Sequence, residues 1–460
     1  MKNTYKIKTI VTLCSLFCLV SCEKYIDTDL PYNQIGTEEV FSDASSANAA
    51  LAGLYAELWS SSIISGDVSG SAAILGTYTD DLTCYAVYIQ NGMVDLYNNA
   101  HISSNTIVYN LWSKAYKHIY YTNSIIKGVS ESETISQTNK DRLIGEAVVL
   151  RSLLYYNLSQ IFDEIPYTIS TDYTYNSQLK KISKEELLAH LEEDISSVLN
   201  GLNDQYANQE RIFVNRKVGE LLLAKIYLLE QKWANAEGLL LGIIQSPLYA
   251  FETDITKVFL KTGKHILWQL KPANTTDATK EYLLFNFTTS IPTSFALSES
   301  LVNSFELTDL RKQNWILPAV ISQKTYYRPM KYKNPTNSNS TENSVVFRLE
   351  EVYLLYAETL VRQNRTEDAK IWIDKLRQRA GLSTLPSGLS QTAMFSKIEE
   401  EWRHEFFAEM GHRFFDLKRL DMMNKIAVSK LNWKSFHSSF PIPERELIIN
   451  PNLKPQNNGY

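Results

Sequence analysis

The stretch EEEWRHEFFAEMGHRFFDLKRL, residues 399–420, crowds acidic and basic side chains together. Two carboxylates about 5 to 10 Å apart on either side of a cleft are the machinery of a glycoside hydrolase. The stretch offers acids and bases for such chemistry, namely Glu401, Glu405, Glu409, Asp416, Arg403, His404, His412, Arg413 and Arg419. These residues form either an acid–base site or a helix that is held together by its own charges.

On one continuous helix, Glu405, Glu409 and Arg413 stand four residues apart, and Asp416 follows three residues later. Such spacing makes opposite charges neighbours, and each exposed pair stabilises a helix by only a few tenths of a kcal/mol. A basic neighbour lowers the pKa of a carboxyl group, which is the wrong direction for a general acid. An apolar stripe also runs along the predicted helix through Phe406, Met410, Phe414 and Leu417. The pattern therefore predicts a structural helix and no catalytic site, so the chain is predicted not to be an enzyme.

Helical patterns dominate the rest of the chain, and we predict helices within residues 42–59, 105–129, 140–162 and 183–202. A helix pair occurs twice, because Ala224 lies twelve residues before Ala236 and Ala357 lies twelve before Ala369. Small residues at these places let two antiparallel helices approach closely. The spacing of twelve residues between them resembles that of a tetratricopeptide unit. The copies are far apart, which argues against a simple tandem array, and two unrelated helical hairpins are the alternative.

The helical pattern is interrupted in residues 248–346, which contain the strand-like runs KHILWQLK and YLLFNFTTSIP and the polar stretch KNPTNSNSTEN. Irregular segments on a rigid helical frame are where binding sites usually lie. We therefore predict a mainly α-helical fold, in which tetratricopeptide-like helix pairs pack against an irregular, loop-rich region with a few short strands. The predicted regions are an N-terminal helical region (37–247), a ligand-binding region (248–346) and a C-terminal region (347–460).

The N-terminus reads as a targeting segment. Lys2, Lys6 and Lys8 precede the apolar run TIVTLCSLFCLV, which is too short to span a bilayer. The run ends in LVSC, which resembles a bacterial lipobox, so we expect a signal peptide (1–21), lipidation of Cys22 and a tether (22–36). An ordinary signal peptide that contains cysteines is the alternative. Since no later run is long and apolar enough for a membrane helix, the lipid would anchor the protein.

Cysteine, histidine and charge exclude several classes of protein. Only Cys84 remains beyond Cys22, so neither an internal disulfide nor a zinc cluster is expected. The seven histidines have no metal-ligand spacing, no glycine-rich phosphate loop occurs, and we predict no cofactor. Residues 1–21 contain three lysines and no acid, so their removal changes the net charge from −5 to −8. An acidic chain without a basic block argues against nucleic acid as a partner.

Five ordered motifs resemble the SusD/RagB family of lipoproteins. The first is the charged stretch itself, whose matching residues are Glu401, Arg403, Glu405, Glu409, Gly411, Arg413, Asp416, Leu417 and Arg419. It departs from the family pattern at Met410, which is inserted before the glycine, and at Trp402, which replaces an arginine. The other motifs are GEAVVLRSLLYYNLSQIFDEIPY, VVFRLEEVYLLYAETLVRQN, LRQRAGL and FPIPERELIINPNLKPQNNGY. With the lipobox, the resemblance covers essentially the whole chain.

The resemblance implies a surface lipoprotein of a Bacteroidota outer membrane that faces outward. Such proteins lie as a lid on a SusC-like TonB-dependent transporter, capture glycans or peptides, and are not enzymes. We expect an oligosaccharide ligand and keep a peptide ligand, as in RagB-like proteins, as the alternative. A tetratricopeptide scaffold that binds only proteins and a glycoside hydrolase are the other classes considered. The whole-chain resemblance disfavours the first, and the lack of a carboxylate pair disfavours the second.

The resemblance also implies where the ligand binds. A sugar ring packs its apolar face on an aromatic side chain and needs hydrogen-bonding partners for its hydroxyl groups. The corresponding segments are Thr77–Asn99 and Asn314–Tyr332, and the candidate ligand-binding residues are Asp81, Tyr85, Tyr88, Asn91, Tyr97, Trp315, Tyr326 and Tyr327. Each ring could instead be packed in the interior. Five rings in predicted helices are assigned to the core: Trp59, Trp112, Tyr116, Trp233 and Trp372.

Overall fold

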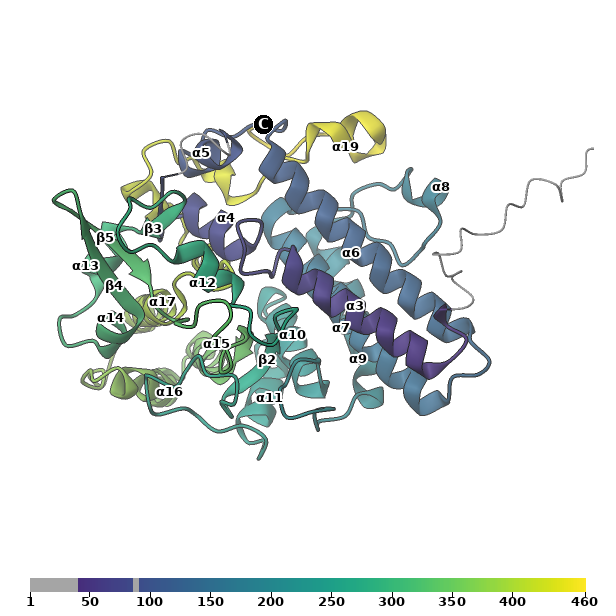
Figure 1. Ribbon diagram of the computed structural model, residues 1–460, viewed down its shortest axis with the longest axis horizontal. Coiled ribbons are helices and arrows are strands. Elements are labelled where there is room, and N and C mark those ends of the chain that lie inside the picture. Colours follow the sequence, from purple (N-terminus) through teal and green to yellow (C-terminus); the bar gives the residue numbers. More distant parts are fainter. Residues whose placement is uncertain (1–39, 86–90) are drawn as a thin grey trace, which may run out of the picture.

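The computed structural model describes residues 40–85 and 91–460, and it is mainly α-helical with short strands (Figure 1). The predicted signal peptide, Cys22, the tether and Tyr88 lie outside the described residues. The α-helices are α3 (Ala44–Ser60), α4 (Ser71–Tyr78), α5 (Asn91–Tyr97), α6 (Thr106–Glu131), α7 (Gln137–Phe162), α8 (Tyr173–Asn176), α9 (Lys184–Val198), α10 (Arg216–Leu229), α11 (Trp233–Ile244), α12 (Lys280–Phe285), α13 (Glu299–Ser304), α14 (Leu310–Trp315), α15 (Leu349–Arg362), α16 (Thr366–Arg379), α17 (Gln391–Phe406), α18 (His412–Arg419) and α19 (Glu444–Ile449). The strands are β1 (Leu82–Cys84), β2 (Ile266–Leu270), β3 (Phe295–Leu297), β4 (Ile316–Ile321), β5 (Lys324–Pro329) and β6 (Ser344–Arg348), and the short 3₁₀ helices are η2 (Leu199–Gly201), η3 (Met423–Val428), η4 (Ser435–Ser438) and η5 (Pro451–Leu453).

Neighbouring helices pack in pairs, as predicted. Helices α6 and α7, α10 and α11, and α15 and α16 form three such pairs. The four alanines at the predicted contacts, Ala224, Ala236, Ala357 and Ala369, are fully buried. Helix α11 also packs directly against α15, so the two predicted copies are adjacent in space although a long insertion separates them in sequence. The mainly α-helical, tetratricopeptide-like fold is therefore confirmed, and the helix stack is continuous across the insertion.

Polar side chains define where several of these helices begin. Asp43 accepts hydrogen bonds from the backbone N–H groups of Ser45 and Ser46 before α3. Ser183 caps α9 through the N–H of Glu186, which is the contact that the Ser-x-x-Glu pattern predicts. Each cap satisfies donors that the first turn of a helix leaves without partners.

The strands form two small antiparallel sheets. Strands β2 and β6 pair with each other, with β2 in contact with α3 and α10 and β6 with α15, and β1, β3, β5 and β4 form the second sheet in that order. In the second sheet Thr83 lies opposite Ala296, Leu297 opposite Tyr327, and Ala319 opposite Tyr326. This sheet lies at the left of Figure 1, at the opposite end of the molecule from α6 and α9. It joins the segment after α4 to the hairpin β4–β5, which lies far along the chain.

The five aromatic rings that were predicted to lie in the core either belong to the main core or pack against it. Trp59 and Trp112 are buried, whereas Tyr116, Trp233 and Trp372 are partly buried and pack against the main core. Within residues 40–85 and 91–460, none of the helices combines the length and the apolarity that crossing a bilayer requires.

The prediction of one continuous helix over residues 399–420 is wrong. Helix α17 ends at Phe406 and α18 begins at His412, and Ala408, Met410 and Gly411 between them have φ angles of +56°, +44° and +73°. A left-handed backbone at these positions cannot continue an α-helix. A Cβ atom at Gly411 would lie 2.8 Å from the Leu75 side chain, so α18 also approaches α4 closely there.

The charges of this stretch therefore pair with distant segments. Glu405 accepts hydrogen bonds from Arg348 and Arg379, and Glu409 accepts one from Arg348 Nη2 at 3.0 Å. Burial alone would raise the pKa of Glu405, but the guanidinium groups of Arg379, Arg348 and Arg311 hold it well below its ordinary value. Within α18, two pairs at helical spacing do form, since His412 Nδ1 lies 3.3 Å and Arg419 Nη1 lies 2.6 Å from Asp416. The stretch is structural, as predicted, but it acts through buried ion pairs.

Candidate ligand-binding site

One face of the four-stranded sheet carries an aromatic cluster. Side chains alternate between the two faces of a strand, so Thr83 and Tyr85 share one face, and so do Lys324, Tyr326 and Arg328. Pairing of β1 with β3 and of β3 with β5 puts these two sets on the same side of the sheet. Tyr85 N donates to Ser294 O at 2.8 Å, which extends the pairing beyond β1.

The cluster is separate from the main hydrophobic core. The rings of Tyr85 and Tyr326 meet edge to face with centroids 5.4 Å apart, and Phe287 lies 6.5 Å from Tyr326. Ala296, Ile321 and Ala319 complete a group of apolar side chains that stands apart from the main core. Within this group the rings of Tyr326 and Phe287 are nearly buried, at 7% and 9% exposed, and Tyr85 is half-buried beside them. We call Phe287, Ala296, Ala319, Ile321, Tyr326 and Tyr85 the sheet cluster.

Hydrogen-bonding and charged groups border the sheet cluster. Lys324 Nζ lies 5.2 Å from the centroid of the Tyr326 ring and 5.7 Å from that of Tyr85. Arg328 Nη1 donates to Phe287 O at 2.9 Å, while Arg328 Nε has no partner among the described residues. Burial, followed by the nearby Tyr326, Tyr97 and Glu299, raises the pKa of Tyr85. Its hydroxyl group therefore stays protonated at neutral pH and can both donate and accept a hydrogen bond.

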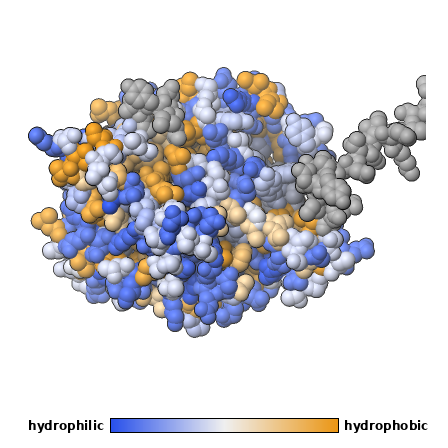
Figure 2. All heavy atoms as spheres, viewed as in Figure 1, coloured by the Kyte–Doolittle hydropathy of each residue, from blue (hydrophilic) through white to orange (hydrophobic). Residues whose placement is uncertain are grey.

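A hollow of about 410 Å³ adjoins the sheet cluster and shares Phe287 with it. Its other lining residues include Leu283, Leu284 and Asn286 of the α12 region and Pro292. Figure 2 shows hydrophobic side chains gathered over the part of the surface where β3, β5 and α12 lie in Figure 1. An open hollow of this size, lined by Phe287 and next to the sheet cluster, suits a ligand of a few sugar rings or a short peptide.

Two family models match most of the described chain. The model described as "SusD family" matches residues 310–460, and the model described as "Starch-binding associating with outer membrane" matches residues 40–228. The chain belongs to the SusD family. "SusD-like protein P25" of Formosa agariphila is 23% identical over 98% of this chain and 99% of that protein, and "SusD-like protein P2" of the same organism is 22% identical over 99% of each.

Solved structures of SusD proteins share the fold. A SusD superfamily protein from Bacteroides vulgatus has a TM-score of 0.78 at 19% identity and covers 91% of this chain and 100% of its own. Surface glycan-binding protein A from Bacteroides thetaiotaomicron in complex with laminarihexaose has a TM-score of 0.74 at 18% identity, over 90% of this chain and 100% of its own. At these identities the likeness establishes the fold alone.

Two of the candidate residues of this SusD family chain lie together in the sheet cluster, namely Tyr85 and Tyr326. Tyr327 follows Tyr326 directly and therefore points to the opposite face of the sheet, where it packs against the main core. Tyr97 is half-buried under Lys430, whose Nζ lies 3.6 Å from the ring centroid. Asn91 begins α5, and Tyr88 lies outside the described residues.

The structure places Asp81 and Trp315 in the interior. Asp81 accepts a hydrogen bond from Arg403 Nε at 3.0 Å, and the ring of Trp315 is buried with its Nε1 donating to Ile255 O at 3.1 Å. In this conformation both support the surrounding structure and present no surface to a ligand.

Sequence reasoning missed Phe287, Lys324 and Arg328. Lys324, Tyr326 and Arg328 alternate along one short segment, so a strand pattern at period two could have indicated the two basic residues. No local signal indicated Phe287, because it reaches the sheet from the loop after α12. Among the described residues, no group of three or more His, Cys, Asp or Glu side chains could hold a metal ion.

Proposed function

We propose that this SusD family protein captures an oligosaccharide on the sheet cluster and delivers it to a SusC-like TonB-dependent transporter. The observation that carries the proposal is the position of the sheet cluster, whose rings Tyr85, Tyr326 and Phe287 lie outside the main core and beside an open hollow that Phe287 lines. A sugar ring would stack on the accessible part of this cluster, above all on Tyr85, which is half-buried, whereas Tyr326 and Phe287 are nearly buried behind it. Its hydroxyl groups would pair with the Tyr85 hydroxyl group and with Lys324 Nζ, which is exposed beside the rings.

Relatives support this reading. One solved structure with the same fold is a "Laminarin binding SusD-like protein", and another holds laminarihexaose. The description of the matching N-terminal family model supports association with the outer membrane. Lipidation at Cys22, an outward orientation and the transporter partner belong to the same proposal.

The proposed role is non-catalytic. The acids that could have formed an acid–base pair, Glu401, Glu405 and Glu409, are buried in ion pairs with arginine and lysine side chains. The arginine and lysine partners lower the pKa values of Glu405 and Glu409 below the ordinary value, and an ionised carboxylate cannot donate a proton to a leaving group.

A peptide ligand is the second candidate, because Lys324 and Arg328 offer positive charge to a carboxylate beside the rings. The two candidates are separated by incubating the purified protein with an array of polysaccharides and peptide mixtures, followed by calorimetry on each hit. We expect a saturable glycan hit that weakens at least about tenfold in Tyr326→Ala. Peptide binding without any glycan hit would establish the second candidate and refute the first.

The control for this experiment is Tyr120→Ala, which removes an exposed tyrosine from α6. The control should bind the glycan as the parent does. Because the Tyr326 ring is only 7% exposed, Tyr326→Ala also removes buried contacts, so circular dichroism first checks that this variant is folded. An equal loss of binding in both variants would place the site away from the sheet cluster.

A further inference from the structure

A groove of about 370 Å³ lies between α6, the segment that contains α8, and α19. In Figure 1, α8 and α19 lie beside the upper half of α6, away from the four-stranded sheet at the left. The lining residues of this groove include no member of the sheet cluster. We call it the α6–α19 groove.

Aromatic side chains form much of the α6–α19 groove. Trp112, Tyr116 and Tyr120 line it from α6, Tyr173 from α8 and Ile449 from α19. The ring centroids of Trp112 and Tyr116 lie 4.9 Å apart. Tyr120 and Tyr173 are 48% and 80% exposed, and Tyr116 is half-buried. A ligand can therefore reach ring surface in this groove from solvent.

Hydrogen bonds hold the walls of the α6–α19 groove together. Tyr116 Oη on α6 donates to Pro166 O, ahead of α8, at 2.7 Å. Asn450 Nδ2 at the end of α19 donates to Leu179 O, beyond α8, at 2.7 Å. The groove thus has its shape before a ligand arrives, which lowers the entropic cost of binding.

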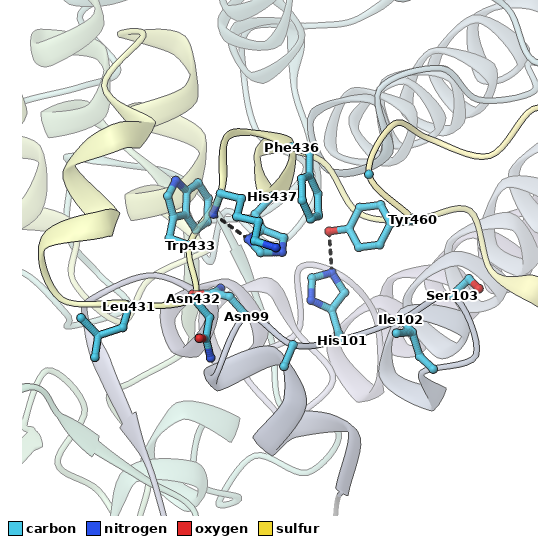
Figure 3. A pocket seen from close by; sticks show the side chains of 13 residues that line it. Asn99, His101, Ile102, Ser103, Leu431, Asn432, Trp433, Phe436, His437 and Tyr460 are labelled. Carbon is cyan, nitrogen blue, oxygen red and sulfur yellow. Dashed lines mark hydrogen bonds between the residues drawn. The ribbon is translucent and has the colours of Figure 1, made fainter.

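The start of α19 is held as well. Glu444 N donates to Ser103 O at 2.9 Å. In Figure 3, Ser103 lies on the same loop as His101, whose Nε2 lies 2.9 Å from Tyr460 Oη. Tyr460 Oη in turn lies 3.1 Å from Ser439 O. The chain is therefore fastened to this loop on both sides of α19, which fixes where the side chains of α19 stand.

Glu446 on α19 is the one charged side chain among the described lining residues of the groove. It is half-buried, and burial raises the pKa of its carboxyl group. Within residues 40–85 and 91–460, no basic group or hydrogen-bond donor offsets this effect of burial. The neighbouring Arg445 turns to Tyr109, with its guanidinium carbon 4.9 Å from the ring centroid. The Glu446 carboxylate therefore lines the groove without a cation of its own.

The charge and the rings of the groove favour the same kind of ligand. A partly desolvated carboxylate is stabilised by an opposite charge, and the faces of aromatic rings attract cations. An anion would be repelled by Glu446, and a neutral molecule would leave the carboxylate without a counter-charge. Only a cation with an apolar body meets both features.

We propose that the α6–α19 groove binds an organic ammonium ion. Its alkyl groups would lie against Tyr116, Tyr120 and Tyr173, and its charge would lie beside Glu446. A small free amine and a lysine side chain of another protein carry the same chemistry. The site is separate from the sheet cluster, so the proposal does not rest on glycan capture.

Saturation-transfer difference NMR on the purified protein tests the proposal. Choline, Nα-acetyl-lysine amide and 3,3-dimethylbutan-1-ol, the uncharged counterpart of choline, are each titrated to about 100 mM. We expect at least one cation to bind with a dissociation constant on the order of 1–10 mM and the alcohol to bind about tenfold more weakly than choline. Tighter binding of choline would indicate a free amine, and tighter binding of the lysine derivative would indicate a protein side chain. The proposal is overturned if neither cation binds, or if the alcohol binds as tightly as choline.

A charge variant tests the role of Glu446 directly. Glu446→Gln keeps the shape of the side chain, so it should weaken binding of the cation about tenfold and leave binding of the alcohol unchanged. Glu444→Gln is the matched control, because Glu444 is exposed on the same helix and does not line the groove. Equal binding of the cation by Glu446→Gln and by the parent would overturn the proposal.

A ring variant tests the aromatic contribution. Tyr173→Leu keeps an apolar side chain and removes the ring, and it should weaken binding of the cation about threefold. Tyr175→Leu is its control, since Tyr175 is 58% exposed on the same helix and does not line the groove. Tyr173 is largely exposed, so both variants should keep the circular dichroism spectrum of the parent. An equal effect of the two substitutions would contradict a contact between the cation and Tyr173.

Discussion

Arg348 and Glu405 meet in the protein interior, where Arg348 Nη1 donates to Glu405 Oε1 at 2.5 Å across 57 residues of sequence. Arg348 Nη2 also donates to the Glu405 carbonyl oxygen and to Glu409 Oε1, each at 3.0 Å. The guanidinium group therefore bridges the last turn of α17 and the left-handed segment that follows. It ties the start of α15 to the place where the chain turns into α18. The charged residues of the motif therefore stabilise the turn between α17 and α18.

We predict that Arg348→Met strongly destabilises the fold. The variant leaves Glu405 and Glu409 buried with fewer partners, and removing one member of a buried ion pair costs about 3–5 kcal/mol. Urea unfolding followed by circular dichroism measures this change in the free energy of unfolding. The control is Arg365→Met, whose half-exposed pairs with Glu237 and Asp368 should contribute no more than about 1 kcal/mol. Equal losses in the two variants would contradict the proposed role of Arg348.

Gly411→Ala should lower the free energy of unfolding by roughly 1–3 kcal/mol, because a residue with a Cβ is strained at a φ of +73° and would press on Leu75 and Ser71. Gly53→Ala is the opposite case. Gly53 lies within α3, and no neighbouring atom comes within 4 Å of the place that a Cβ atom would occupy, so alanine there should stabilise the protein by about 0.5–1 kcal/mol. Thermal melts of both variants test the pair. A stabilised Gly411→Ala would show that the left-handed turn is not required.

We predict that the buried carboxyl group of Glu281 makes the free energy of unfolding depend on pH. Its carboxyl is buried on α12, where burial raises its pKa to about 7, and it accepts a hydrogen bond from Ser344 Oγ at 2.7 Å. The folded state thus holds a proton that the unfolded chain releases near pH 4.5. The contribution of Glu281 is complete below about pH 4.5 and is lost as the pH rises through about 7, with a total on the order of 3 kcal/mol.

Urea unfolding at pH 5 and at pH 8 measures this effect. The free energy of unfolding of the parent should decrease from pH 5 to pH 8. Glu281→Gln cannot ionise at this position, so its decrease should be smaller by about the contribution of Glu281. Identical pH profiles for the parent and the variant would show that the carboxyl does not ionise in this range in the folded state.

Two substitutions of Tyr85 separate the contribution of its ring to glycan binding from that of its hydroxyl group. Tyr85→Phe keeps the ring and should retain glycan binding within a few fold, whereas Tyr85→Ala should weaken binding about tenfold, since an aromatic contact contributes roughly 0.5–1.5 kcal/mol. Calorimetry with a glycan identified by the array measures both variants. Tyr175→Ala, which removes an exposed ring on α8, is the control and should bind as the parent does. A larger loss in Tyr85→Phe than in Tyr85→Ala would contradict a stacking role.

The helices and their pairing could be predicted because their signals are local. The apolar spacing repeats within two turns, the alanines twelve residues apart lie within one helix pair, and the structure confirms the pairs that they predict. The site was predicted only in part. Tyr85 and Tyr326 were among the candidates and lie together, but whether an aromatic ring is exposed depends on what packs over it, and Trp315 is covered by Phe259 and the backbone of Ile255.

By itself the sequence determined the mainly helical class of this protein, its tetratricopeptide-like pairs and its SusD family motifs, because spacing and residue type along the chain encode these features. Only the tertiary structure decided that residues 399–420 form two helices, that their acids pair with Arg348 and other distant residues, and that Phe287 joins Tyr85 and Tyr326. The physical reason is the same in each case. Buried charges and clustered rings take partners that are close in space and far apart in sequence, and the packing of the whole chain determines those partners.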